Sequence, residues 1–225
     1  MMDDVEIITT SDGSHTLWNK RLNETYHSVH GAVQESIHVF IKNGLQYFHH
    51  TQNAQSIAIL EVGFGTGLNA LLTCEYANDH GINVGYTTLE PFPLAADVWR
   101  KLNYRHSDPR CFTSIHEAQW DTRVQISAGF NIEKRRTSLT DANLEVGYDV
   151  IYFDAFAPSV QPELWSQDTL RLVTARLNVC GVFVTYSAKG QLKRDLRDLG
   201  LKVETLEGPP GKNEMVRAIN LRDDK

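Results

Sequence analysis

Residues Ser56–Leu72 read Ser-Ile-Ala-Ile-Leu-Glu-Val-Gly-Phe-Gly-Thr-Gly-Leu-Asn-Ala-Leu-Leu, and this stretch decides the fold. The run 57–60 is apolar and suits a buried strand, and glycines at every second position then lead into an apolar helix. Because Gly63, Gly65 and Gly67 carry no side chain, a ligand can lie directly against the loop and the N-terminus of the helix. The stretch therefore predicts a loop that binds a nucleotide-type cofactor, and a glycine-rich turn that serves packing alone is the alternative.

The spacing of the glycines indicates which cofactor it is. A dinucleotide fingerprint has glycine at its first, third and sixth positions, but the sixth position counted from Gly63 is Leu68. The loop also lacks the Lys-Ser or Lys-Thr pair of a phosphate-binding loop. Glu61, two residues before the first glycine, would repel a pyrophosphate and attract the ammonium group of a methionine moiety. S-adenosyl-L-methionine (SAM), which has an amine and a sulfonium instead of phosphates, fits this pattern.

The composition is that of an ordinary globular protein. The chain has 225 residues, of which 41% are hydrophobic and 22% charged, so it fits one α/β domain with additions. No apolar run approaches the ~20 residues of a membrane span, and we expect a cytoplasmic protein. Cys74, Cys111 and Cys180 form no CxxC pair and indicate neither a disulfide framework nor a metal site. The net charge of −6 counts mildly against broad nucleic-acid binding, although local basic patches are present.

Acidic residues also follow two later strands. Val84–Leu89 reads as the second core strand and ends in Glu90, where a carboxylate would hold the hydroxyls of a ribose. Tyr148–Phe153 is the clearest remaining strand, and beside the first strand it would deliver Asp154 to the transferable group. The alternatives are that Glu90 is an ordinary carboxylate at a strand end and that Asp154 only caps a loop.

An adenine-contacting residue is expected after the third core strand, which we place near residues 125–136. The candidates are Ser138, Leu139 and Asp141, and the sequence does not decide among them.

The remaining pattern predicts the rest of the fold. It indicates a hairpin over 6–18, a helix over 34–45 that ends or bends at Gly44, and a terminal antiparallel pair over 203–206 and 215–220. We predict an α/β, Rossmann-like fold with a seven-stranded, mostly parallel sheet, helices on both faces, an N-terminal extension and a small β insertion. Residues 1–50 would form a hairpin and lid helix, and residues 51–225 the core.

Six segments together resemble the MnmC-like methyltransferase family over nearly the whole chain. They are Glu24–Ser28, Gly31–Phe40, Leu60–Asn69, Tyr152–Pro158, Thr185–Gly190 and Gly208–Met215. Glycine loops are shared by all SAM enzymes of this fold, but Gly-Phe-Gly-Thr-Gly-Leu-Asn combined with Asp-Ala-Phe-Ala-Pro and Gly-Lys-x-Glu-Met is specific to the family.

The resemblance implies an activity on tRNA. It is the SAM-dependent methylation of the aminomethyl group of 5-aminomethyl(-2-thio)uridine at the wobble position, giving 5-methylaminomethyl(-2-thio)uridine. Bifunctional members continue into a flavin-dependent oxidase domain, for which this chain has no room. We therefore expect a stand-alone methyltransferase, with a separate oxidase or another modification enzyme as a candidate partner. A methyltransferase of small-molecule amines and a non-catalytic SAM-binding protein are the alternatives.

The resemblance and the motifs together assign roles to individual residues. Asp154 is expected to be catalytic, because it would accept the N–H groups of the amine and balance the positive charge that develops on nitrogen. The residues expected to bind the cofactor are Tyr26, Ser28, Glu35, Glu61, Gly63, Gly65, Gly67, Asn69, Glu90, Ser138 and Asp154. Those expected to bind the substrate are Phe156, Pro158 and Trp165 at the uracil, and Lys189, Lys193, Arg194 and Lys212 along the tRNA backbone. No metal is expected.

Overall fold

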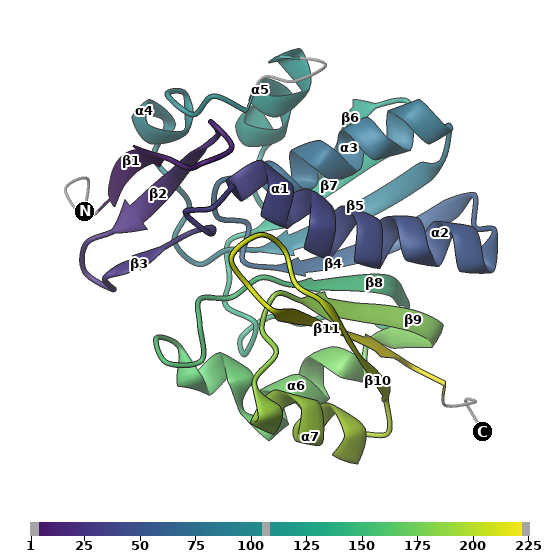
Figure 1. The fold of residues 1–225 in the computed structure, drawn as a ribbon. Helices are drawn as coiled ribbons and strands as arrows, with labels where there is room; N and C mark the ends of the chain where they lie inside the picture. The colour runs from purple at the N-terminus through teal and green to yellow at the C-terminus, as the bar shows by residue number, and fades with distance from the viewer. Residues whose placement is uncertain (1–4, 105–108, 222–225) are drawn as a thin grey trace.

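A twisted sheet runs through the centre of the protein, as the computed structural model shows for residues 5–104 and 109–221 (Figure 1). The outermost residues of the two predicted units, 1–4 and 222–225, lie outside the described residues. Within the described part the main sheet has eight strands in the order β10-β11-β9-β8-β4-β5-β7-β6. They are β4 (Ser56–Val62), β5 (Asn83–Leu89), β6 (Arg123–Ser127), β7 (Phe130–Arg135), β8 (Tyr148–Phe153), β9 (Leu177–Thr185), β10 (Lys202–Glu207) and β11 (Glu214–Ile219).

The five central strands are parallel, and the antiparallel partners stand at the two edges. β4 pairs in parallel with β5 on one side and with β8 on the other. The predicted second strand, the strand that carries Asp154 at its end and the terminal antiparallel pair are all confirmed. The carboxyl ends of β4, β5 and β8 therefore meet at one edge of the sheet, where a ligand is expected in this kind of fold.

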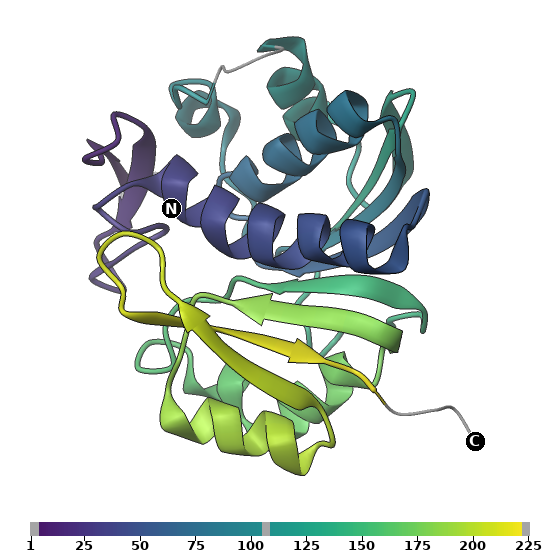
Figure 2. The same cartoon turned by 45° about the vertical axis from the view of Figure 1, so that its right-hand side comes forward.

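Helices cover both faces of the sheet (Figures 1 and 2). Alternate residues of β4 point to opposite faces, so Ile57 and Ile59 join one buried cluster while Leu60 and Val62 join the other. On the first face lie α1 (Ala32–Ser36), η1 (Ile37–Gln46), α2 (Tyr47–Gln52), α3 (Leu68–His80), α4 (Ala96–Trp99) and α5 (Pro109–Glu117). On the second lie η2 (Pro162–Trp165), α6 (Gln167–Thr174) and α7 (Gly190–Asp198).

Two predictions about the strands need correction. The hairpin of β6 and β7 is not an insertion, because β7 pairs in parallel with β5 and is the third core strand. Its alternate residues Phe130, Ile132 and Lys134 are completely buried, as in a strand inside a sheet. β6 then adds an eighth strand at the edge where seven were predicted in all.

The helix predicted to end or bend at Gly44 does not end there. α1, η1 and α2 follow one another without a break from Ala32 to Gln52, and the middle part is π-helical. A Cβ atom at Gly44 would lie 3.0 Å from Val184 and 3.2 Å from Tyr152, so glycine lets this helix lie close to the sheet. The helix also crosses the boundary that we predicted at residue 50.

The N-terminal segment forms a small sheet of its own. β1 (Val5–Thr9) pairs with β2 (His15–Asn19) as the predicted hairpin, and β3 (Glu24–Thr25) pairs with β2. This sheet and the loop between β10 and β11 reach toward each other at the carboxyl edge of the main sheet (Figure 2). Among the described residues, no helix is both long and apolar enough to cross a lipid bilayer.

Candidate functional site

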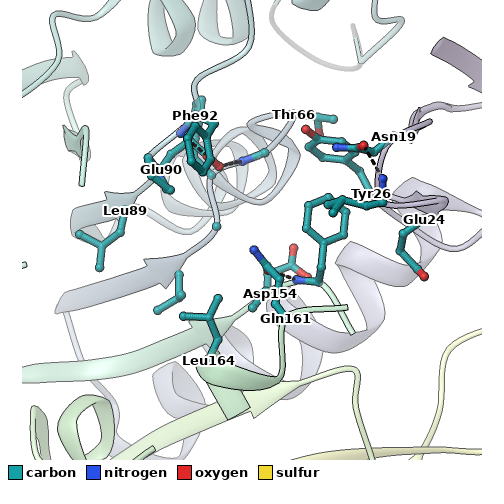
Figure 3. Close-up of a pocket in the computed structure, with 18 of the residues that line it drawn as sticks. Asn19, Glu24, Tyr26, Thr66, Leu89, Glu90, Phe92, Asp154, Gln161 and Leu164 are labelled. Carbon is teal, nitrogen blue, oxygen red and sulfur yellow. Dashed lines mark hydrogen bonds between the residues drawn. The ribbon is translucent and has the colours of Figure 1, made fainter. Parts of the chain in front are cut away.

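A cavity of about 1340 Å³ opens at the carboxyl ends of β4, β5 and β8 (Figure 3). Its walls come from the glycine loop, the residues after β5 and β8, the loop 136–141 and the N-terminal segment. Most of the predicted site residues line it: Tyr26, Ser28, Glu35, Gly63, Gly65, Asn69, Glu90, Ser138, Asp154, Phe156 and Lys212. The volume is large enough for a nucleoside cofactor together with part of a second molecule.

The glycine loop passes so close to the end of β8 that a side chain does not fit. Gly63 has a φ of +93°, and a Cβ atom there would lie 2.7 Å from the carbonyl oxygen of Asp154. The N–H of Asp154 donates to the carbonyl oxygen of Val62 at 3.0 Å, and the N–H of Gly63 donates to that of Leu89 at 3.0 Å. These bonds hold the carboxyl ends of β4, β5 and β8 together. Gly67 does not line the cavity; it is the left-handed residue that precedes α3.

Glu90 lies at the cavity wall where the ribose of the cofactor is predicted. One carboxylate oxygen accepts the N–H of Gly65 at 3.1 Å, and the other accepts the N–H of Phe92 at 2.9 Å. Burial raises the pKa of Glu90, and the two backbone donors lower it again. The carboxylate is thus fixed beside the loop, with lone pairs left to accept hydroxyl groups.

Asp154 lies on the far side of the loop from Glu90 and is held by a side-chain amide. Nδ2 of Asn69 donates to Oδ2 of Asp154 at 2.9 Å. The pKa of Asp154 is raised to about 7, because burial and the charge of Glu35 raise it more than Asn69 and Lys212 lower it. A carboxyl with this pKa changes its charge near neutral pH, as general bases of enzymes do.

Glu35 and Lys212 form an ion pair in the same part of the cavity. Glu35 accepts the ammonium of Lys212 on one oxygen and the N–H of Ser28 at 2.6 Å on the other. The ammonium also lies 3.8 Å from the centre of the Tyr186 ring, whose hydroxyl donates to the carbonyl oxygen of Ala155 at 2.9 Å. The ammonium of Lys212 is thus paired with Glu35 at the cavity, and its predicted contact with the tRNA backbone remains a prediction.

Aromatic residues form the wall beside Asp154. The rings of Tyr26 and Phe156 meet edge to face with centroids 5.1 Å apart. Trp165 lies behind this wall, because its indole N–H donates to the carbonyl oxygen of Phe156 at 2.8 Å and the residue is buried. Neither Trp165 nor Pro158 lines the cavity, so the predicted contact of these two with the uracil is not supported.

The other predicted basic residues lie outside the cavity around α7. Lys189 immediately precedes this helix, while Lys193 pairs with Glu214 at 2.7 Å and Arg194 donates to Gln191 at 2.8 Å. α7 lies at the second face of the sheet (Figure 1), and the contact of these three residues with tRNA remains a prediction.

All three candidates for the adenine contact, Ser138, Leu139 and Asp141, line the cavity, and the hydroxyl of Ser138 donates to the carboxylate of Asp141 at 2.6 Å. The structure also brings to the cavity residues that the sequence did not single out. Phe92 is 77% exposed at the rim, and Gln161 and Tyr186 reach the wall from loops. Only Phe92 had a signal in the sequence, because it follows Glu90 directly between two prolines. Within residues 5–104 and 109–221, no group of three His, Cys, Asp or Glu side chains is placed to hold a metal ion.

Comparison with known proteins finds similarity to methyltransferases. A family model described as "S-adenosyl-L-methionine-dependent methyltransferase" matches residues 132–220. The "tRNA 5-methylaminomethyl-2-thiouridine biosynthesis bifunctional protein MnmC" of Burkholderia thailandensis is 28% identical, over 93% of this chain and 34% of its own length. The protein of the same name from Magnetococcus marinus is 32% identical, over 91% of this chain and 32% of its own length. The chain thus spans about one third of the length of these curated relatives.

Solved structures agree with this result. MNMC2 from Aquifex aeolicus superposes with a TM-score of 0.81 at 25% identity, over 97% of this chain and 70% of that chain. Spermidine synthase from Thermotoga maritima reaches a TM-score of 0.61 at 13% identity, over 96% of this chain and 68% of that chain, and shows the fold alone. The predicted Rossmann-like methyltransferase fold is confirmed, and SAM, predicted from the glycine loop, is the cofactor in the description of the matched family.

Proposed function

Because the chain is in sequence and in fold an MnmC-like, SAM-dependent methyltransferase, we propose that it methylates the aminomethyl group of 5-aminomethyl(-2-thio)uridine at the tRNA wobble position. The observation that carries the proposal is the recessed carboxylate of Asp154, which Asn69 holds beside the cofactor loop and an aromatic wall. The relatives are named for tRNA 5-methylaminomethyl-2-thiouridine biosynthesis, which supports this acceptor. We propose the cytoplasm as the location, and a separate oxidase as the enzyme that exposes the amine.

The cavity fits SAM at each of its parts. Glu90 suits the ribose hydroxyls, and the pair Ser138 and Asp141 suits the amino group of adenine. At the other end Glu35 and Lys212 present one negative and one positive charge, which match the ammonium and carboxylate of a methionine moiety. Gly63 and Gly65 line the cavity between these ends.

Asp154 would perform the chemical task of the protein at the acceptor nitrogen. When bound, SAM supplies a methyl group that is already activated by its positive sulfur. The acceptor amine forms a bond to the methyl carbon while the carbon–sulfur bond breaks, and the nitrogen then releases one proton to water. Asp154 orients the amine by accepting its N–H groups and stabilises the positive charge that grows on nitrogen.

Transfer of labelled methyl groups tests the proposal. We expect the protein to move tritium from methyl-labelled SAM to bulk tRNA from cells that lack it, and nucleoside mass spectrometry should find the label on 5-methylaminomethyl-type uridine. Small amines are tested in parallel, since the net charge of −6 would suit an acceptor without phosphates. Label on small amines with none on tRNA would indicate that the substrate is a small-molecule amine. Binding of SAM without transfer to any acceptor would indicate a non-catalytic protein.

Gln161 is placed to recognise the uracil. Its Oε1 accepts the N–H of Phe156 at 3.1 Å, which leaves the N–H₂ donors of the amide for the cavity that this residue lines (Figure 3). The carbonyl or thiocarbonyl groups of a uracil accept such donors, whereas the amino group of a cytosine does not. We therefore propose that Gln161 contributes to selection of the base.

Substitution of Gln161 separates this role from its structural one. Gln161→Glu keeps an acceptor for the N–H of Phe156 but removes the donors, and we expect kcat/KM for tRNA to fall about 5-fold or more, since a hydrogen bond contributes about 1 kcal/mol. The Kd for SAM, measured by titration calorimetry, should stay unchanged. Gln125→Met, at an exposed position on β6, is the control. Wild-type kcat/KM in Gln161→Glu would refute the contact.

A further inference from the structure

Glu61, which the sequence suggested for the ammonium of SAM, lies behind the cofactor loop. It is completely buried on β4 and does not line the cavity. In the sheet its direct neighbours are Thr88 on β5 and Tyr152 on β8. Its surroundings are thus the protein interior, where an isolated negative charge is very unfavourable.

The hydrogen bonds around Glu61 are incomplete. The hydroxyl of Thr88 donates to Oε2 of Glu61 at 2.7 Å. Oε1 of Glu61, Oδ1 of Asn69 and the hydroxyl of Tyr86 are buried without a hydrogen-bond partner in the part of the chain that the structure describes. Two of these three atoms are pure acceptors when Glu61 is ionised, so they cannot satisfy each other in that state.

Among residues 5–104 and 109–221, no positive group acts on Glu61 in the way that Lys212 acts on Glu35. The titratable groups that act on it are the carboxyl of Asp154 from the end of β8 and the hydroxyls of Tyr86 and Tyr152 from the neighbouring strands. The pKa of Glu61 is raised to about 8, because burial and the charge of Asp154 raise it more than the hydrogen-bonding groups of Thr88, Tyr86 and Asn69 lower it. Burial likewise raises the pKa of both tyrosines, so the whole group is most stable without charge.

We propose that Glu61 is a protonated positioning residue, whose O–H donates to Oδ1 of Asn69 and thereby turns Nδ2 of that amide toward Asp154. This chain of hydrogen bonds, from Glu61 through Asn69 to Asp154, is called the relay below. The structure shows its second bond, from Nδ2 of Asn69 to Oδ2 of Asp154 at 2.9 Å. An ionised Glu61 would instead attract the amide N–H₂ and leave the oxygen of Asn69 facing Asp154. The inference rests on the proposed function for the role of Asp154, but the protonation of Glu61 is tested without tRNA.

Glu61→Gln distinguishes this role from an ionised cofactor ligand. The glutamine amide is neutral, accepts from Thr88 and donates to Asn69, so we expect the Kd for SAM and kcat to stay within about 3-fold of wild type. In Glu61→Leu the donor is missing, and kcat should fall about 10-fold or more while the Kd for SAM changes little. A Kd that rises 10-fold or more in Glu61→Gln would overturn the proposal, because it would mean that the negative charge binds the cofactor.

The pH dependence of thermal stability gives a second measurement that needs no substrate and does not depend on how Glu61→Leu folds. The pKa of Glu61 is about 8 in the folded chain and 4.5 ordinarily, so its stabilising contribution is present below about pH 4.5 and is lost as pH rises toward 8. Between pH 6 and 9 the Tm of wild type should fall by about 3 °C or more beyond the fall seen in Glu61→Gln. Parallel curves would show that Glu61 is ionised and refute the relay.

The two experiments also separate this inference from the proposed function. If wild type transfers no methyl group to tRNA, the proposed function fails, while the Kd for SAM and the Tm curves still decide the protonation of Glu61. If wild type methylates tRNA and Glu61→Gln loses SAM, the relay alone fails.

Discussion

Asp154→Asn is expected to lower methyl transfer by at least about 10²-fold, because the amide accepts fewer N–H groups and carries no negative charge to balance the developing ammonium. The side chain keeps its size and its contact with Asn69, so the Kd for SAM should remain within about 3-fold. Single-turnover transfer from labelled SAM to tRNA measures the first quantity and titration calorimetry the second. Asp168→Asn, at a side chain that is 91% exposed on α6, is the matched control.

The raised pKa of Asp154 determines in which direction the activity changes with pH. The pKa of Asp154 is raised to about 7, so the carboxylate is present above that pH and is lost as pH falls. In wild type, kcat/KM should therefore decline on the acid side of pH 7, and Asp154→Asn should lack this step. A variant that retains more than about one tenth of wild-type transfer would exclude Asp154 as the catalytic residue.

Gly63→Ala is expected to disrupt both stability and cofactor binding. The residue has a φ of +93°, and its Cβ atom would lie 2.7 Å from the backbone oxygen of Asp154. We expect the free energy of unfolding to drop by about 1–3 kcal/mol from backbone strain, and the affinity for SAM to drop about 10-fold or more as the loop moves from the strand end. Urea unfolding and titration calorimetry measure the two effects.

Gly85→Ala is the control for this substitution within the same sheet. Gly85 lies on β5, has no strained backbone angle, and its Cβ atom would meet nothing within 4 Å. Its free energy of unfolding should change by about 0.5 kcal/mol or less. Equal losses in the two variants would show that any side chain on this sheet is harmful, and the explanation through the contact with Asp154 would fall.

The sequence predicted the central part of the fold because parallel strands impose a simple rule. Their carboxyl ends meet at one edge, so the glycine loop, Glu90 and Asp154 had to converge once the three strands were recognised. The strand pairings confirm that step. The alternation of buried and open positions does not reveal that Glu61 lies outside the cavity. A shift of one residue along the strand decides whether a side chain faces the cavity or lies behind the loop.

Contacts between distant segments were beyond the sequence. Lys212 looked like a surface residue in a Gly-Pro-rich turn, and only the return of β10 and β11 places its ammonium against Glu35. The sequence does not show that Gln161 lines the cavity while Trp165 lies behind its wall. Their different hydrogen bonds to the backbone of Phe156 distinguish the two positions. Gly44 reads as a helix terminator on propensity, but its tight contact with Val184 and Tyr152 decides otherwise, as packing often does.

The ion pair of Lys212 and Glu35 also bears on the order of folding. The two residues are 177 positions apart in the chain, and a contact of that separation has a high entropic cost until most of the domain has formed. A chain that has assembled β4, β5 and β8 thus possesses the glycine loop before it possesses the charged end of the cavity. Tight binding of a zwitterionic ligand would then require the completely folded chain. The bound ligand would stabilise the native state by mass action.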